Sequence, residues 1–216
     1  VNGRPLAVRE IAERVPAVVE AWVPGEKGGQ AVAEVLFGAV NPSGKLPVTV
    51  PRHAGQLPAY YDAKKSKEYW IKEGWGHPYA DMEPTPLYPF GHGLSYTTFA
   101  YGKLGLGTAE IGPKDPVEVR VDVRNSGERR GEEVVQLYVR DVVSSVATPV
   151  MALKGFARVG LEPGETRTVT FTLTPEHLAL LDRHMARVVE PGEFKVLVGS
   201  SSADIRAEGS FVVRER

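Results

Sequence analysis

From residue 99 onward, apolar and polar residues alternate in short runs separated by turn residues. Residues 117–124 give the clearest run, Val-Glu-Val-Arg-Val-Asp-Val-Arg, and Asn-Ser-Gly follows it as a turn signal. A period of two is typical of an antiparallel strand with one face in the core and the other in water. About seven strands at such spacing predict an all-β, immunoglobulin-like sandwich. The comparable runs cover residues 133–140, 153–161, 166–173, 194–199 and 206–213.

Turn residues between these runs support the same prediction. Residues 162–165 and 190–193 both have the sequence Glu-Pro-Gly-Glu, and a Pro-Gly pair favours a tight turn. We therefore expect a corner of the sandwich at each place. Residues 175–181 are expected to form a short helical turn that begins at Thr174 as its cap.

The first third of the chain has a different pattern. Residues 5–8 and 17–22 are short apolar runs that indicate strands, and residues 11–14 indicate a turn of helix. Residues 28–37 carry apolar side chains at helical spacing before Gly38, a probable stop signal. Two strands and one good helix do not complete a parallel sheet. We therefore expect an α/β fragment, the end of an α/β/α sandwich whose remaining strands lie in other polypeptide.

Residues 41–97 are rich in Pro, Gly, His and aromatic residues and have little periodicity. A long segment with so many aromatic rings is expected to be ordered and packed across a domain junction. The predicted organisation is a C-terminal segment of the α/β sandwich over residues 1–62, an ordered connector over 63–95 and a fibronectin type III-like β-sandwich over 96–216.

Composition excludes several classes of partner and site. A net charge of -1 over 216 residues, with 25% charged and 42% apolar residues, offers no field that would attract nucleic acid or an anionic membrane. No run reaches the roughly 20 apolar residues of a membrane span. The five His residues are not spaced for a metal and there is no Cys. We expect no metal, cofactor, nucleic-acid or membrane partner, and the sequence assigns no compartment.

Four ordered stretches in the first hundred residues form a specific combination. They are residues 20–26 with the pair 28–29, residues 36–49, residues 51–52, and residues 86–99 with the sequence Pro-Leu-Tyr-Pro-Phe-Gly-His-Gly-Leu-Ser-Tyr-Thr-Thr-Phe. Together they closely resemble the C-terminal part of family 3 glycoside hydrolases of the β-glucosidase type. Residues 121–127, 131–139 and 153–156 resemble the fibronectin type III-like module that follows in many members.

The resemblance implies a retaining exo-acting β-glycosidase, commonly a β-glucosidase, that releases a terminal sugar from an oligosaccharide or glycoside. Retention needs two carboxyl groups roughly 5 to 5.5 Å apart. In this family the nucleophile is an Asp on an N-terminal barrel, and the acid/base is usually a Glu earlier in the α/β domain. Both are expected upstream of Val1, so no catalytic residue is assigned here. The expected partner is that missing N-terminal barrel and sandwich portion, and the sequence leaves a homo-oligomer open.

Four side chains are candidates for substrate binding. Trp22 precedes a Pro-Gly loop and has a face that could stack on a sugar, although it could equally pack at an interface. Glu26 could contact substrate or only favour the N-terminus of the following helix. Trp70 and Trp75 lie in an aromatic and polar stretch that suits a sugar subsite or a clamped interdomain strap.

Two functional hypotheses follow. The main one is a structural and subsite-supporting part of a β-glucosidase-like enzyme that is inactive by itself. The alternative is a stand-alone β-sandwich module that binds carbohydrate or another protein. The sandwich carries few aromatic residues on its predicted solvent face, which disfavours a sugar-binding platform.

Overall fold

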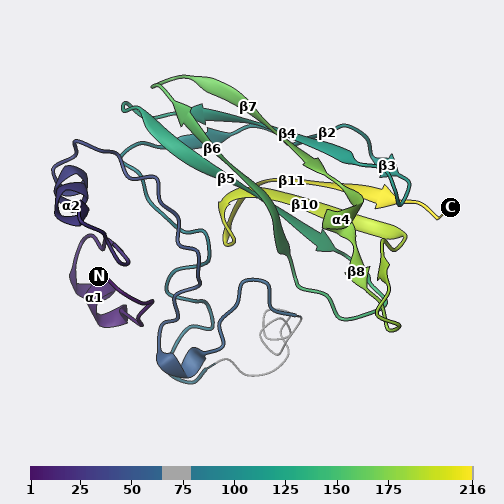
Figure 1. Ribbon diagram of the computed structural model, residues 1–216, viewed down its shortest axis with the longest axis horizontal. Coiled ribbons are helices and arrows are strands. Elements are labelled where there is room, and N and C mark those ends of the chain that lie inside the picture. The colour runs from purple at the N-terminus through teal and green to yellow at the C-terminus, as the bar shows by residue number, and fades with distance from the viewer. Residues whose placement is uncertain (65–78, 216) are drawn as a thin grey trace.

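The computed structural model describes residues 1–64 and 79–215. Its larger part is a sandwich of two β-sheets (Figure 1). One sheet is built around β4 (Val117–Asn125), which pairs with β7 (Thr166–Leu173) on one side and with β1 (Phe99–Tyr101) and β2 (Gly105–Leu106) on the other. The other sheet has the order β3-β11-β10-β5-β6.

The second sheet contains the longest strands of the molecule. Its pairs are antiparallel except that β3 runs parallel to β11. A separate two-stranded hairpin of β8 (Leu180–Leu181) and β9 (Arg187–Val188) follows the short helix α4 (Pro175–Leu178). The strands of the second sheet are β3 (Glu110–Ile111), β5 (Gly131–Asp141), β6 (Ala152–Leu161), β10 (Gly192–Ser201) and β11 (Asp204–Val213).

The core lies between the two sheets and follows the predicted alternation. Val117, Val119, Val121 and Val123 of β4 are almost completely buried, and polar side chains stand between them on the solvent face. Branched side chains pack well on a pleated surface. The six predicted runs correspond to β4, β5, β6, β7, β10 and β11, so the sandwich prediction is confirmed.

The predicted corners are also present. Gly164 lies between β6 and β7 and Gly192 begins β10, and both have positive φ angles, 78° and 148°. Glycine adopts such angles without steric cost. Thr174 precedes α4 as predicted, and its backbone N–H donates to Nδ1 of His177 at 3.0 Å.

Strand β5 departs from the predicted pattern because neither of its faces is solvated. Residues 133–139 are all buried, including Gln136 and Tyr138. The inner face packs in the sandwich core, and the outer face is covered by described residues of the aromatic-rich segment 41–97, which is called the connector from here on. There the ring of Tyr61 stacks on Phe90 with centroids 4.1 Å apart and meets Tyr138 edge-on at 5.8 Å. The connector is therefore part of the packing of this sheet.

The connector also makes contacts between its own residues. It contains the 3₁₀ helix η1 (Ala54–Gln56), and Val50 forms an isolated antiparallel bridge with Tyr88. Gln56 is buried; its Nε2 donates to the carbonyl of Pro84 at 2.9 Å and its Oε1 accepts from the Arg52 N–H at 2.9 Å. Residues 50–56 and 84–88 are thus fixed side by side.

The N-terminal part lies to one side of the sandwich (Figure 1). The two predicted helices are present as α1 (Arg9–Arg14) and α2 (Gly28–Leu36). The two predicted strands are not: residues 5–8 and 17–22 form no strand. Val1 N–H donates to the Val19 carbonyl and Ala21 N–H to the Val1 carbonyl, both at 2.9 Å, so only a short parallel contact exists. An isolated pair of strands is marginal without neighbours on both sides.

Within the described residues, no helix combines the length and the apolar character that a membrane crossing requires.

Candidate functional site

The most elaborate polar site of the described chain lies where the connector meets the outer face of β5. Residues 44–46 meet residues 91–93 here, and we call this place the crossing. Leu46 N–H donates to the His92 carbonyl at 2.9 Å, and Gly91 N–H donates to the Leu46 carbonyl at 2.8 Å. Gly91 has a φ of +80°, and a Cβ there would collide with the Gln136 side chain. Both the left-handed backbone and the close approach of Gln136 therefore favour glycine at position 91.

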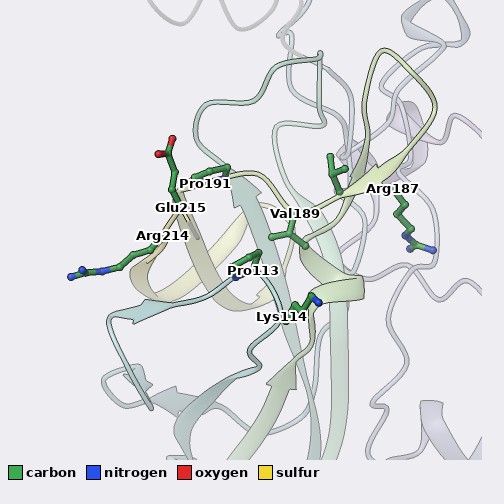
Figure 2. A pocket seen from close by; sticks show the side chains of 8 residues that line it. Pro113, Lys114, Arg187, Val189, Pro191, Arg214 and Glu215 are labelled. Atoms are coloured by element: carbon green, nitrogen blue, oxygen red, sulfur yellow. The ribbon is translucent and has the colours of Figure 1, made fainter.

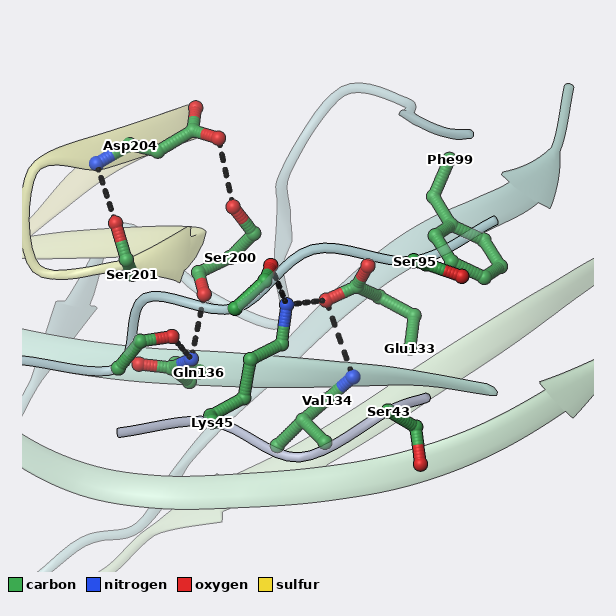
Figure 3. Close-up of polar contacts among 12 residues, drawn as sticks. Ser43, Lys45, Ser95, Phe99, Glu133, Val134, Gln136, Ser200, Ser201 and Asp204 are labelled. Atoms are coloured by element: carbon green, nitrogen blue, oxygen red, sulfur yellow. Dashed lines mark hydrogen bonds and ion pairs between the residues drawn. The ribbon is translucent and has the colours of Figure 1, made fainter. Parts of the chain in front are cut away.

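A buried ion pair ties the crossing to the sandwich. The Lys45 ammonium lies 3.1 Å from Oε1 of Glu133, with side-chain exposures of only 13% and 6% (Figure 3). The ammonium also donates to the Gly93 carbonyl at 3.2 Å, and the same Glu133 oxygen accepts from the Val134 N–H at 3.1 Å. Such additional hydrogen bonds are what a buried pair needs to offset its desolvation.

Gln136 forms a second buried link between the connector and the sheet. Its Nε2 donates to the Gly91 carbonyl at 3.1 Å and to the Ser200 carbonyl at 2.6 Å (Figure 3). Its Oε1 accepts from the Tyr138 hydroxyl at 2.5 Å. Burial raises the pKa of the Tyr138 phenol, and Tyr61 adds to this effect. The amide thus joins the connector, β5 and β10 at one point.

Two asparagines fix the ends of the connector. The Asn41 side chain donates to the Arg130 carbonyl at 3.0 Å and accepts from the Ser95 hydroxyl at 2.9 Å and the Tyr96 N–H at 2.8 Å. Asn125 is fully buried and accepts from the Thr97 hydroxyl at 2.7 Å. Its amide also donates to two backbone carbonyls, those of residues 129 and 161.

A charged group on the sandwich stands beside the crossing. Arg206 lies over the Tyr101 ring, with Cζ 5.1 Å from the centroid, and donates to the Phe99 carbonyl at 2.6 Å. It also pairs with Asp204, Nη2 to Oδ2 at 2.7 Å, and hydrogen bonds from Arg206 hold the pKa of that carboxyl below its usual value. Burial raises the pKa of Tyr101, and the Glu133 carboxylate acts in the same direction.

The structure describes two of the four predicted substrate-binding residues. Trp22 is half-buried with a φ of +52°, an uncommon angle for a residue other than glycine. Its N–H donates to Oε1 of Glu20 at 3.0 Å, and its carbonyl accepts from the Gly3 N–H. Glu26 is exposed in the same loop, ahead of α2. Trp70 and Trp75 lie outside the described residues.

Helix α2 and the residues next to it are largely uncovered. Gly28 is the only buried residue of α2. Val23, Leu36 and Phe37 are 83%, 64% and 89% exposed, although a lone helix gains little stability without a packed apolar face. The helix is held from one direction by the Tyr96 hydroxyl, which donates to the Val35 carbonyl at 2.7 Å.

A hollow of about 450 Å³ lies at the far end of the sandwich (Figure 2). Its floor includes Pro113, Val189 and Pro191, and the side chains of Arg187 and Arg214 point away from each other. Among the described residues that line this hollow, Glu215 is the one carboxylate, so these residues do not supply the pair of acids that glycoside hydrolysis needs. Residues 1–64 and 79–215 also contain no group of three or more His, Cys, Asp and Glu residues arranged to hold a metal.

Comparison with known proteins assigns both parts of the chain. Residues 1–96 match the Glycosyl hydrolase family 3 C-terminal domain, and residues 133–202 match the Fibronectin type III-like domain. A β-xylosidase from Formosa agariphila is 46% identical over 94% of the chain, and a periplasmic β-glucosidase from Salmonella typhimurium is 42% identical over 97%. The chain belongs to glycoside hydrolase family 3.

Solved family 3 structures have the same fold in this region. A β-glucosidase from Erythrobacter marinus superposes with a TM-score of 0.91 at 46% identity, over 99% of this chain and 27% of that one. A Listeria innocua β-glucosidase mutant in complex with laminaribiose gives 0.91 at 37% identity, over 99% and 30%. The chain spans 27% and 28% of the Formosa and Salmonella relatives. These matches favour part of a family 3 enzyme over a stand-alone module.

Sequence reasoning missed the polar residues that join the two family 3 regions. Lys45, Gln136 and Asn41 lie in stretches that carry the family resemblance, but they were not singled out as linking residues because each lies far along the chain from its partners. The available signal was a polar residue inside an otherwise apolar strand: Gln136 stands between Val135 and Leu137. A buried amide of this kind requires partners.

Proposed function

We propose that the chain is the C-terminal portion of a retaining exo-acting β-glycosidase of the β-glucosidase type, which hydrolyses terminal β-linked sugars of oligosaccharides or glycosides. In this proposal the chain supports the enzyme and its subsites and does not carry out the chemistry by itself. The nucleophilic Asp and the acid/base Glu come from the preceding barrel and sandwich portion. The family match and the relatives, which are more than three times as long, support this assignment.

The observation that carries the proposal is the uncovered apolar side of the N-terminal part. Leu36 and Phe37 end α2 with most of their surface in water, and Val23 stands exposed in the loop before it. Large exposed apolar side chains around a helix with a single buried residue support the proposal that other polypeptide covers this part of the chain. The proposed cover is the rest of the α/β sandwich, which would also complete the short parallel contact between residues 1–3 and 19–22.

In the proposed enzyme the units are residues 1–62, 63–95 and 96–216. Residues 1–62 complete the α/β sandwich domain. Residues 63–95 connect that domain to residues 96–216, the β-sandwich that supports it. Trp22 and Glu26 are proposed to support a substrate subsite from the loop before α2. The left-handed backbone of Trp22 is consistent with such a role, since strained conformations gather at functional sites.

A chimera tests this proposal. The matching C-terminal segment of the thermostable β-glucosidase B from Acetivibrio thermocellus, which is 44% identical, is replaced by this chain and assayed with aryl β-glucosides and β-xylosides. We expect activity with the sugar preference of the parent, because the catalytic carboxylates remain in place.

Two variants of the chimera serve as a matched pair. Phe37→Asp puts a charge on the proposed interface and is expected to lower the yield of folded, active enzyme by about tenfold or more, since an unpaired charge is costly to bury. Thr170→Asp adds the same charge to the exposed face of β7 and is expected to have little effect. A chimera that folds but is inactive, or equal effects of the two variants, contradicts the proposal.

A further inference from the structure

The outer face of the sheet around β4 carries a row of charges with alternating signs. The residues of β4 that alternate with its buried valines are Glu118, Arg120, Asp122 and Arg124, and the last three are exposed. Every second residue of a strand points to the same face, and such residues lie about 7 Å apart. The four side chains therefore form one line of charges in the order minus, plus, minus, plus.

Threonines border this charged row on one side. Each of the four charged residues has an exposed cross-strand partner on β7. In the order of the row these partners are Thr172, Thr170, Thr168 and Thr166. The Thr168 hydroxyl also donates to Oδ1 of Asp122 at 2.5 Å. On this side the charged groups have short polar neighbours only two carbons and one oxygen in size.

Glycine and alanine border the charged row on the other side. Ala100 of β1 and Gly105 of β2 are cross-strand partners of residues in the row. The backbone N–H groups of Gly102 and Gly107 donate to carbonyls of the row at 2.8 and 2.9 Å. Because these four residues have little or no side chain, a second flat surface can reach the charged groups from above.

The described residues leave this face open. The connector packs on the other sheet, where Tyr61 meets Tyr138, and the N-terminal part lies to one side of the sandwich (Figure 1). Within the row, Arg120 pairs with Glu118, and their side chains are 63% and 40% exposed. Exposed pairs contribute little to stability, so these charges can exchange partners at small cost.

The order of the charges is complementary to itself when the strand direction is reversed. If two β4 strands face each other in antiparallel register about Val121, Glu118 of each copy meets Arg124 of the other, and Arg120 meets Asp122. All four contacts then join opposite charges, whereas a parallel register would join like charges. A two-fold axis between the two faces, perpendicular to β4, generates the antiparallel arrangement, and such symmetric contacts are the commonest in homodimers.

We propose that the outer face of the sheet around β4 binds a second copy of the chain in this two-fold, antiparallel arrangement. Complementary charges across an interface fix its register. The face is three strands wide, which is small compared with the roughly 800 Å² per partner of a stable complex, so the association is weak and decreases with salt. The face belongs to the sandwich alone, and the pairing does not depend on the glycosidase assignment.

Sedimentation velocity of the 216-residue chain measures this association. From about 10 to 500 µM protein we expect the mean mass to rise toward a dimer in about 50 mM salt, and to return toward the monomer in about 0.5 M salt. Asp122→Arg creates two like-charge contacts in the pair and should raise the dissociation constant at least about tenfold. Glu208→Arg, at an exposed position of β11, makes the same change of charge and should leave the constant unchanged.

Combined variants test the register itself. Arg120→Asp should weaken the association as Asp122→Arg does, but a mixture of the two variants should associate, because each offers the charges that the other lacks. A wild-type chain that stays monomeric over this range, association that the reversals leave unchanged, or a mixture as weak as its components overturns the proposal.

The double variant Arg120→Asp/Asp122→Arg decides if a single variant does not fold. Its charge order is again complementary to itself, so it should associate with itself as strongly as the wild type. Mixed with the wild type it should form few mixed dimers, because Arg120 and Asp122 of the wild type would each meet a like charge. Free mixing of the two proteins in dimers would overturn the proposed register.

Discussion

The ammonium of Lys45 lies 3.1 Å from the carboxylate of Glu133, and both side chains are nearly removed from water. Lys45 belongs to the connector and Glu133 to β5 of the sandwich, so the pair links segments that are distant in sequence. Breaking a buried pair from one side leaves an uncompensated charge, and that cost is larger than the net contribution of the intact pair.

Lys45→Met should therefore lower the free energy of unfolding by about 3 kcal/mol. The double variant Lys45→Met/Glu133→Gln should lose clearly less than the single one, because it leaves no buried charge. Chemical denaturation of the three proteins measures these differences. Arg120→Met is the control: it breaks an exposed pair with Glu118 and should cost well under about 1 kcal/mol. A double variant that is as unstable as Lys45→Met, or less stable, would contradict the coupling.

Gln136→Met should cost about 2 kcal/mol or more, because it leaves the carbonyls of Gly91 and Ser200 and the Tyr138 hydroxyl without their partner in a buried place. Gln30→Met removes an amide that pairs with Glu34 on the exposed surface of α2, and we expect a change within about 0.5 kcal/mol. Thermal or chemical unfolding distinguishes the two. Equal effects would mean that the network around Gln136 contributes no stability.

The connector should be necessary for the sandwich. A chain of residues 41–216 keeps Tyr61 and Phe90 on the outer face of β5, whereas a chain of residues 96–216 exposes Tyr138 and Gln136 there. We expect the shorter chain to be less stable, to bind a hydrophobic dye and to self-associate, as an uncovered apolar face predicts. Dye fluorescence measures the exposed apolar surface of the two chains, and light scattering measures their self-association. A short chain that is as stable and monomeric as the long one would refute this dependence.

Local pattern was sufficient for the strands and turns of the sandwich, because each strand there carries its own alternation of apolar and polar residues. It was insufficient where another segment supplies the burial. Gln136 and Tyr138 face the connector. Nothing in the sequence of β5 indicates that another segment of the chain covers this face. Asn125 was predicted only as part of a turn and instead makes buried hydrogen bonds to Thr97 and two carbonyls.

In the N-terminal part, the sequence predicted strands that the structure does not contain. Apolar runs at residues 5–8 and 17–22 predicted strands, but a strand requires neighbours for its hydrogen bonds as well as suitable side chains. Among residues 1–64 and 79–215, it is residues 1–3 that form such backbone bonds to residues 19–22. The motifs of the same region identified the family correctly, because they depend on residue identity and order and not on completed packing.

Asp141 gives a prediction on pH dependence. Burial at the end of β5 raises the pKa of Asp141 to about 6, and the nearby Glu190 carboxylate acts in the same direction. Because the folded state holds this proton more tightly than the unfolded state, the contribution of this carboxyl to stability is fully present below about pH 4 and is lost as the pH rises through about 6. Asp141→Asn should thus be more stable than the wild type at pH 7.5 and similar to it near pH 4.

Unfolding temperatures at the two pH values measure this difference. Glu193→Gln, on the exposed face of β10, is the control and should leave the difference unchanged. An Asp141→Asn protein that is no more stable than the wild type at pH 7.5 would show that the Asp141 carboxylate is well accommodated as an anion.

The most direct measurement of the central claim is an assay of the purified 216-residue chain with aryl β-glucosides and aryl β-xylosides. We predict no hydrolysis above the buffer rate, because the proposed nucleophile and acid/base belong to the preceding barrel and sandwich portion of the enzyme. Turnover that disappears when one of the chain's own carboxylates is neutralised, for example in Glu26→Gln, would contradict this prediction.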